Sequence, residues 1–370
     1  MKVLHVSGAR KWGGNEQQLV YLVEELERKG VDQYLFGYEK SVLATRLEDS
    51  AIRRLLIPYV KPYKKEYRRK LKDIIQEHKI DLIHLHTSDS VTGYVVTDML
   101  HGLHTKTVFS KKGISRKTSF LSKYKYNYRK IHKIICVSEV VKEHFKKVLH
   151  PSQHEKLGVV YDAVKPSSKQ EHLESTVQLA SLLNLEDTTV ILGNIANHTD
   201  AKDLKTLLKT IHHLIYDLQV THVHLVQIGQ YSKRTEELKE LVSQLQLESY
   251  ISFLGFKENA ISYLPQFTLY VMTSQREGGP TTVLEAFSQH IPVVSTKVGV
   301  VGEAIEDGTN GYITQVGDYQ NLARKIKILI EDKALQTKFA ELSYAKFLNS
   351  FTTNHLGTET LKVYQSVLEE

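Results

Sequence analysis

Short apolar stretches alternate with amphipathic ones from the first residues onward. KVLHVSG has the pattern of a buried strand, and the glycine turn Gly13-Gly14 follows it. Residues 16–29 then place apolar side chains at helical spacing, and Gly30 ends that helix. The same alternation predicts strands in VDQYLFGY, KIDLIHLHT, TKTVFS, KIICVS and LGVVYD, and a helix over 66–78. Strands that alternate with helices indicate a parallel sheet.

A polar stretch over 164–174 interrupts this pattern and is typical of an interdomain linker. Beyond it we expect strands in TTVILGNIA, THVHLVQIG, YISFLGF, TLYVMTS, IPVVST and GYITQ, and helical structure over 319–370. The 370 residues exceed one ordinary hydrophobic core. The sequence therefore predicts an α/β protein with two doubly wound domains, 1–165 and 166–350, and a C-terminal helix, 351–370, that packs back toward the first domain.

Composition removes several classes of protein. The single cysteine, Cys136, lies in the apolar stretch KIIC, so a disulfide framework and a cysteine metal site are excluded. No apolar run reaches the roughly 18 residues that a membrane-spanning helix needs. The N-terminal residues begin directly as a strand and turn, without the apolar core of a signal peptide. These features predict a cytoplasmic location.

The segment TSQREGGPTTVLEAF follows a predicted strand and contains the most informative motif. Glu277 precedes a Gly-Gly-Pro turn, and Glu285 lies about a turn and a half into the helix that starts near Thr281. Backbone N–H groups at a helix N-terminus bind anions, and carboxylates accept hydrogen bonds from sugar hydroxyls. Taken alone, the two acids also fit a helix whose acidic side chains favour its dipole.

The context of these two acids resembles glycosyltransferase family 4, whose signature is E-x7-E within EG-x-P-x-x-x-LEA. HIPVVSTKVGVVGEAIEDGTNGYITQVGD is similar to the family's downstream stretch, and GGNE, DLIHLH, IICVS and ISFLGF match further points in the same order. The resemblance covers the whole chain. It implies the GT-B fold, two Rossmann-like domains facing across a cleft, and sugar transfer from a nucleotide-diphosphate-sugar with retention of anomeric configuration.

The resemblance also assigns roles to residues of the donor site. It implies that Glu277 binds hydroxyls of the donor sugar, that Glu285 binds the nucleotide ribose, and that Lys202 neutralises the departing diphosphate. The further donor-binding positions that it implies are the turn and helix-start residues Gly279, Thr281 and Thr282, together with Gly229 after its strand and Phe256 beside the base.

The sequence departs from the family pattern at two places. Asn197 stands five residues before Lys202, where an arginine is usual, so part of the phosphate binding is expected from the Gly13-Gly14 amides or from lysines of the first domain. The loop after TVFS reads Ser-Lys-Lys-Gly, which puts Lys112 where many members carry a histidine. We expect Lys111, Lys112 and His86 on the acceptor side, and Lys112 among the catalytic residues; a surface lysine and a hydrogen-bonded core histidine are the plain alternatives.

The predicted function is a retaining, metal-independent glycosyltransferase that acts on a cell-surface polysaccharide or lipid-linked glycan precursor. The chain contains no D-x-D motif, the pair of aspartates with which metal-dependent sugar transferases of the other common fold hold their ion. We therefore expect no metal and no cofactor besides the nucleotide-sugar substrate. The alternatives are a GT-B epimerase or phosphorylase, and a non-catalytic basic protein that binds membranes or nucleic acid.

Two basic segments bear on the last alternative. The net charge is +7, and residues 106–147 and 59–72 are rich in lysine, arginine and tyrosine. Such segments fit single-stranded nucleic acid, an anionic lipid surface or a solvated basic face. The resemblance favours lipid, since family members often reach lipid-linked acceptors through the first domain. We therefore expect peripheral contact with the inner face of the membrane and no nucleic-acid partner.

Overall fold

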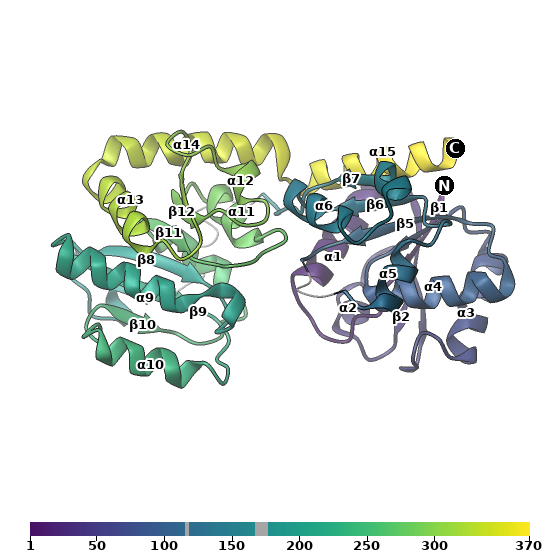
Figure 1. The fold of residues 1–370 in the computed structure, drawn as a ribbon, viewed down its shortest axis with the longest axis horizontal. Coiled ribbons are helices and arrows are strands. Elements are labelled where there is room, and N and C mark those ends of the chain that lie inside the picture. The colour runs from purple at the N-terminus through teal and green to yellow at the C-terminus, as the bar shows by residue number, and fades with distance from the viewer. Residues whose placement is uncertain (115–117, 167–176) are drawn as a thin grey trace. The chain divides into compact units, whose positions relative to one another are not determined.

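The computed structural model describes residues 1–114, 118–166 and 177–370, which divide into two compact units. Unit 1 comprises 1–165 together with 352–370, and unit 2 comprises 166–351. Each unit is a parallel sheet covered by helices (Figure 1). Most of the expected linker, from residue 167 onward, lies outside the described residues.

Unit 1 has a seven-stranded parallel sheet in the order β3-β2-β1-β4-β5-β6-β7. Its strands are β1 (Lys2–Val6), β2 (Asp32–Tyr38), β3 (Arg53–Ile57), β4 (Leu82–Leu85), β5 (Lys106–Lys111), β6 (Lys133–Cys136) and β7 (Leu157–Val159). Its helices are α1 (Gly14–Arg28), α2 (Val42–Arg46), α3 (Lys65–His78), α4 (Ser88–His101), α5 (Phe120–Tyr126), α6 (Glu139–Lys146) and α15 (Thr353–Glu369).

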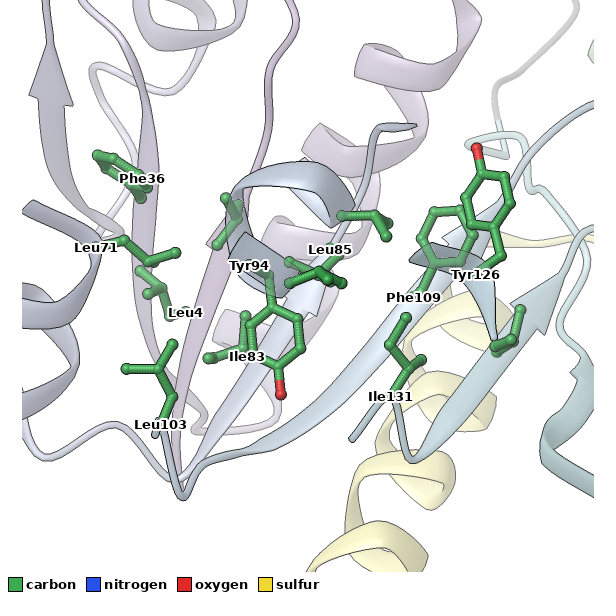
Figure 2. Close-up of a cluster of buried hydrophobic side chains, with 14 of the residues drawn as sticks. Leu4, Phe36, Leu71, Ile83, Leu85, Tyr94, Leu103, Phe109, Tyr126 and Ile131 are labelled. Carbon is green, nitrogen blue, oxygen red and sulfur yellow. The ribbon is translucent and has the colours of Figure 1, made fainter. Parts of the chain in front are cut away.

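The central strands of unit 1 are apolar on both faces because helices cover both sides of the sheet. One face builds the cluster in Figure 2, where Leu4, Ile83 and Leu85 of β1 and β4 meet Leu71 of α3 and Tyr94 of α4. The strand β3 was not predicted from the sequence. Its RRLLI pattern starts with two arginines and its residues are only partly buried, since it is the edge strand of the sheet.

Unit 2 has a six-stranded parallel sheet in the order β10-β9-β8-β11-β12-β13. Its strands are β8 (Val190–Ile195), β9 (Val223–Ile228), β10 (Ile251–Phe253), β11 (Leu269–Met272), β12 (Val293–Thr296) and β13 (Tyr312–Thr314). Its helices are α8 (Leu179–Leu182), α9 (Leu204–His212), α10 (Thr235–Gln244), α11 (Thr281–Ser288), α12 (Val301–Ala304), α13 (Tyr319–Glu331) and α14 (Lys333–Ser350).

The last helix, α15, belongs to unit 1 although it follows unit 2 in the chain. It packs against α1, and Leu356, Tyr364 and Val367 are buried with Leu22 and Leu26 in one apolar cluster. The side chain of Thr353 also donates a hydrogen bond to Glu25 on α1 at 2.7 Å. Unit 1 therefore draws its core from both ends of the sequence.

Both sheets reverse their strand order at one point. The reversal lies between β1 and β4 in unit 1, and between β8 and β11 in unit 2. In doubly wound sheets, ligands bind in the crevice outside the carboxyl ends of the two strands at such a point. The loops after these four strands are therefore where the chemistry of each unit is expected. Among the described helices, none is long and apolar enough to cross a membrane.

Candidate active site

The loops after β8 and β11 bring together two of the predicted donor residues. Lys202 Nζ donates a hydrogen bond to Glu277 Oε1 at 2.6 Å, and Ser274 Oγ donates to the same oxygen at 2.8 Å. The loops are joined through the backbone as well, because Gln275 N donates to Ala201 O at 2.8 Å. The Lys202 and Glu277 side chains are 28% and 13% exposed, so a ligand can reach both partners of this ion pair.

The helix α11 begins at Thr281, as the sequence predicts. Pro280 precedes it in an extended conformation, and no side chain caps its first turn. The N–H groups of Thr281 and Thr282 therefore remain available to an anion, whereas Val283 N donates to Pro280 O at 3.2 Å. Burial raises the pKa of Glu285 to about 7, while the Thr281 side chain and the charge of Lys202 act to lower it.

A pocket of about 240 Å³ lies beside the loops after β8 and β9. It is lined by five residues that the sequence analysis assigned to the donor: Asn197, Lys202, Gly229, Phe256 and Thr282. The Phe256 side chain is 69% exposed, so its ring is free to contact a ligand and is not a core residue. Lys257 lines the same pocket and adds a second cation that the sequence analysis did not single out.

Gly229 is required where the strand β9 ends. A Cβ atom at this position would lie 1.9 Å from the carbonyl oxygen of Ala196, so the two loops approach more closely than any side chain permits. Asn197 fixes the same contact, because its Oδ1 accepts a hydrogen bond from Gln230 N at 2.8 Å. The residue in the place of the usual arginine is thus tied to the neighbouring loop.

The remaining candidates lie in unit 1. Gly13 and Gly14 form the start of α1 after the β1 loop; Gly13 has no side chain to cap the helix, but the Glu16 carboxylate accepts hydrogen bonds from the backbone N–H groups of Gly13 and Glu16. Lys112 follows β5, and its Nζ lies 2.5 Å from Asp162 Oδ1; the two side chains are only 13% and 7% exposed. Lys112 is therefore half of a nearly buried, electrically neutral pair.

Lys111 points to the other side of its strand. Its ammonium group lies 5.4 Å from the centre of the Phe145 ring and donates to the carbonyl of Gly113. Burial lowers its pKa. The two neighbouring lysines thus have different surroundings, and Lys112 is the one that lies near His86, whose pKa its charge helps to lower.

His86 belongs to a buried group of three histidines at the strand reversal of unit 1. His5 Nδ1 and His86 Nε2 are 3.0 Å apart, and His84 contacts Tyr364 and Ser110. Neither His5 nor Asp162 was predicted from the sequence. The motif DLIHLH could have led to His5, because β1 pairs with β4 and sets His5 opposite His84; Asp162 had no signal, since only the fold brings β5 and β7 near each other.

The fold of the chain is that of the GT-B glycosyltransferases, which confirms the predicted fold class. The structure of Anabaena HepE in complex with UDP matches with a TM-score of 0.84 at 20% identity, over 99% of this chain and 100% of that one. The apo form of the lipopolysaccharide outer core galactosyltransferase WaaB matches with a TM-score of 0.76 at 15% identity, over 99% and 100%. At these identities the likeness establishes the fold alone.

Two family models match the chain in succession. Residues 12–168 match Glycosyltransferase Family 4, and residues 177–346 match Glycosyl transferases group 1. The chain belongs to the group 1, family 4 glycosyltransferases. N-acetyl-alpha-D-glucosaminyl L-malate synthase of Bacillus anthracis is 21% identical over 84% of this chain and 81% of its own length. The lipopolysaccharide core biosynthesis glycosyltransferase LpsE of Rhizobium meliloti is 25% identical over 51% of this chain and 54% of its own length.

Proposed function

We propose that this glycosyltransferase moves a sugar from a nucleotide-diphosphate-sugar to a hydroxyl acceptor with retention of anomeric configuration. The observation that carries the proposal is the Lys202–Glu277 pair, whose lysine lines the Phe256 pocket together with Thr282 from the uncapped start of α11. A cation and helix amides suit a diphosphate, and a carboxylate beside them suits sugar hydroxyls. The strand reversal between β8 and β11 is the place where doubly wound sheets bind such ligands.

Each donor group has a separate role in this proposal. The pocket that Gly229 and Phe256 line takes the nucleotide, and the ionised Glu285 carboxylate accepts hydrogen bonds from ribose hydroxyls. The amides of Thr281 and Thr282 bind the diphosphate together with Lys202. Glu277 exchanges its hydrogen bond with Lys202 for bonds to the sugar.

The reaction then depends on stabilising the leaving group. The bond between the anomeric carbon and the phosphate oxygen breaks, and the acceptor oxygen bonds to the same face of that carbon. The acceptor's proton passes to the departing phosphate oxygen, which serves as the base. The Lys202 ammonium and the α11 amides stabilise the charge that develops on the diphosphate, and positioning supplies the rest of the rate enhancement.

This mechanism requires no divalent metal, and we propose that the transferase is metal-independent. Lys202 and the helix amides supply the positive charge that Mg²⁺ or Mn²⁺ provides in other sugar transferases. Activity is expected to persist after EDTA treatment followed by desalting. Loss of activity in EDTA with recovery in Mn²⁺ would contradict metal independence and leave the donor assignment intact.

The acceptor is proposed to be a cell-surface or lipid-linked glycan, reached at an anionic membrane. The names of curated relatives, among them LpsE, support the glycan class. On α5, Phe120, Leu121 and Tyr124 are 82%, 77% and 56% exposed beside lysines, a combination that suits a lipid surface. We expect the wild-type protein to sediment with anionic vesicles. The double change Phe120→Ser and Leu121→Ser should weaken this binding at least fivefold. Equal binding of the wild type and the double variant would overturn the proposed membrane contact.

The decisive experiment for the proposed function is a thermal-shift panel with UDP, GDP, ADP and CMP and their sugar conjugates. A ligand that binds only the native state raises the unfolding temperature with its concentration. UDP is the expected ligand, because it is bound in the similar HepE structure. Lys202→Met is expected to abolish most of the shift, whereas Lys209→Met, on the exposed side of α9, is expected to leave it unchanged. If no nucleotide raises the unfolding temperature, the proposed function fails.

A further inference from the structure

A second set of polar groups lies inside the sheet of unit 1, where the proposed donor chemistry does not use it. His5 lies in β1 and His84 in β4, opposite each other in register, and His86 follows β4 directly. All three are buried, the most exposed being His86 at 9%. Their positions straddle the strand reversal, the point at which ligands of doubly wound sheets bind.

The side chain of Gln33 fixes the proton of His5. Gln33 Nε2 donates to the carbonyl oxygen of Val23 at 2.9 Å, which leaves its Oε1 facing His5 Nε2 at 3.1 Å. An amide oxygen only accepts hydrogen bonds. His5 Nε2 must therefore carry the ring proton, and His5 Nδ1 carries a lone pair.

His5 in turn fixes the proton of His86. His86 Nε2 lies 3.0 Å from His5 Nδ1, which can only accept, so His86 Nε2 must carry the proton of that ring. The remaining nitrogen, His86 Nδ1, then bears a lone pair. It makes no hydrogen bond to any residue of the described ranges, and His86 is the histidine of the three that reaches the surface.

The surroundings keep this arrangement neutral. Burial lowers the pKa of His5 to about 4, and burial together with neighbouring His84 and Lys112 lowers the pKa of His86. The charge of Lys112 is balanced by Asp162. An anionic oxygen at His86 Nδ1 would thus face a lone pair, and the neutralised Lys112 would not attract it. A hydroxyl at the same place could donate a hydrogen bond to Nδ1.

His84 stands apart from this chain of hydrogen bonds. Its Nδ1 lies 2.6 Å from the Tyr364 hydroxyl and its Nε2 lies 2.7 Å from Ser110 Oγ, so both nitrogens have partners. The three histidines could each offer one nitrogen to a metal ion, all within 4.8 Å of one another. An ion there would have to break one hydrogen bond of His5 and one of His84, because both nitrogens of each ring have partners. The hydrogen bonds therefore favour a fixed hydrogen-bonded chain from Gln33 through His5 to His86 over a metal site.

We propose that Gln33 and His5 are positioning residues that hold His86 as the Nε2-protonated tautomer, so that His86 Nδ1 accepts a hydrogen bond from a hydroxyl of a saccharide substrate. That the donor of this hydrogen bond is a saccharide rests on the proposed function. The tautomer itself does not, because the protein's own hydrogen bonds set it. This hydrogen-bonded chain makes His86 Nδ1 prefer a neutral hydroxyl over a phosphate or a carboxylate.

Nitrogen-15 NMR of the histidine-labelled protein tests the tautomer directly. At pH 7.5 His86 is expected to show a protonated Nε2 and an unprotonated Nδ1. Replacing Gln33 by leucine removes the amide oxygen, and the His5 and His86 resonances should then shift toward a mixture of tautomers. A wild-type His86 with its proton on Nδ1, or a stoichiometric metal ion in the purified protein, would overturn the proposal.

Kinetics separate positioning from a loss of stability. With the transferase active, Gln33→Leu should raise the KM for the acceptor by roughly threefold to tenfold, the worth of one neutral hydrogen bond, and leave the affinity for the nucleotide unchanged. Gln18→Leu is the matched control, since Gln18 is also a buried glutamine of unit 1 with two hydrogen bonds, both to Ala163. It should lower the unfolding temperature without moving the His86 resonances. If the His86 resonances and the KM for the acceptor are the same in wild type and Gln33→Leu, the proposed positioning of His86 by Gln33 and His5 is refuted.

Discussion

At the scale of single residues, the proposed donor site holds a carboxyl group in surroundings that oppose its charge. Burial raises the pKa of Glu285 from 4.5 to about 7. The native state therefore binds a proton that the unfolded state has lost between these two pH values, and stability falls as pH rises from 4.5 to 7. A shift of this size corresponds to up to about 3 kcal/mol at pH 8.

Glu285→Gln should consequently stabilise the protein against urea at pH 8, by up to about 3 kcal/mol, with most of the gain gone at pH 5. The same variant should bind UDP more weakly at pH 8, because the neutral amide lacks a carboxylate's second acceptor. Urea titrations at the two pH values measure the first effect, and calorimetry measures the second. An equal change in stability at both pH values would show that the native carboxyl group titrates normally.

At the scale of elements, the close contact between two loops organises the pocket. Gly229 lets the end of β9 approach the Ala196 carbonyl, and Asn197 bonds to the next residue of the same loop. The geometry of the phosphate loop thus depends on a backbone approach as well as on charged side chains.

Gly229→Ala should force these loops apart, since the added Cβ would lie 1.9 Å from the Ala196 oxygen. The expected cost is about 1–3 kcal/mol in unfolding free energy, together with a loss of nucleotide affinity of at least tenfold. Gly158→Ala is the matched control, because a Cβ there meets nothing within 4 Å. Nucleotide titration of both variants provides the comparison. Normal nucleotide affinity in Gly229→Ala would show that the close approach of Gly229 to Ala196 does not shape the pocket.

The elements themselves were largely predictable, and the reason is local. Strands such as β9 and β11 are short apolar runs bounded by turns, so their periodicity alone reveals them. The edge strand β3 was missed because partial burial weakens that signal. For the donor site, the resemblance pointed to Glu277 and Lys202, but their direct ion pair was not foreseen. His5, Gln33 and Asp162 were not predicted, since their partners are distant in sequence and only strand order brings them together.

At the scale of the whole molecule, the chain leaves unit 1, builds unit 2 and returns. Residues 352–370 then complete the core of unit 1 through Leu356, Tyr364 and Val367. The stability of unit 1 should therefore depend on a helix that follows unit 2 in sequence.

Leu356→Ala should destabilise unit 1 by about 2–5 kcal/mol, because Leu356 is only 4% exposed. Leu368→Ala, on the same helix at 37% exposure, should cost far less. Hydrogen exchange read by mass spectrometry should show lost protection in β1, β4 and α1 and unchanged protection in β8 to β13. Loss spread evenly over both units would indicate that they unfold together.

The return of α15 also has a consequence for how the protein forms during synthesis. A ribosome makes the seven strands of unit 1 first, yet the apolar face of α1 that awaits α15 stays uncovered until all of unit 2 has been translated. At about 5–20 residues per second this interval lasts roughly ten to forty seconds. The unit that is begun first is finished last, and a chaperone that shields Leu22 and Leu26 would act within that interval.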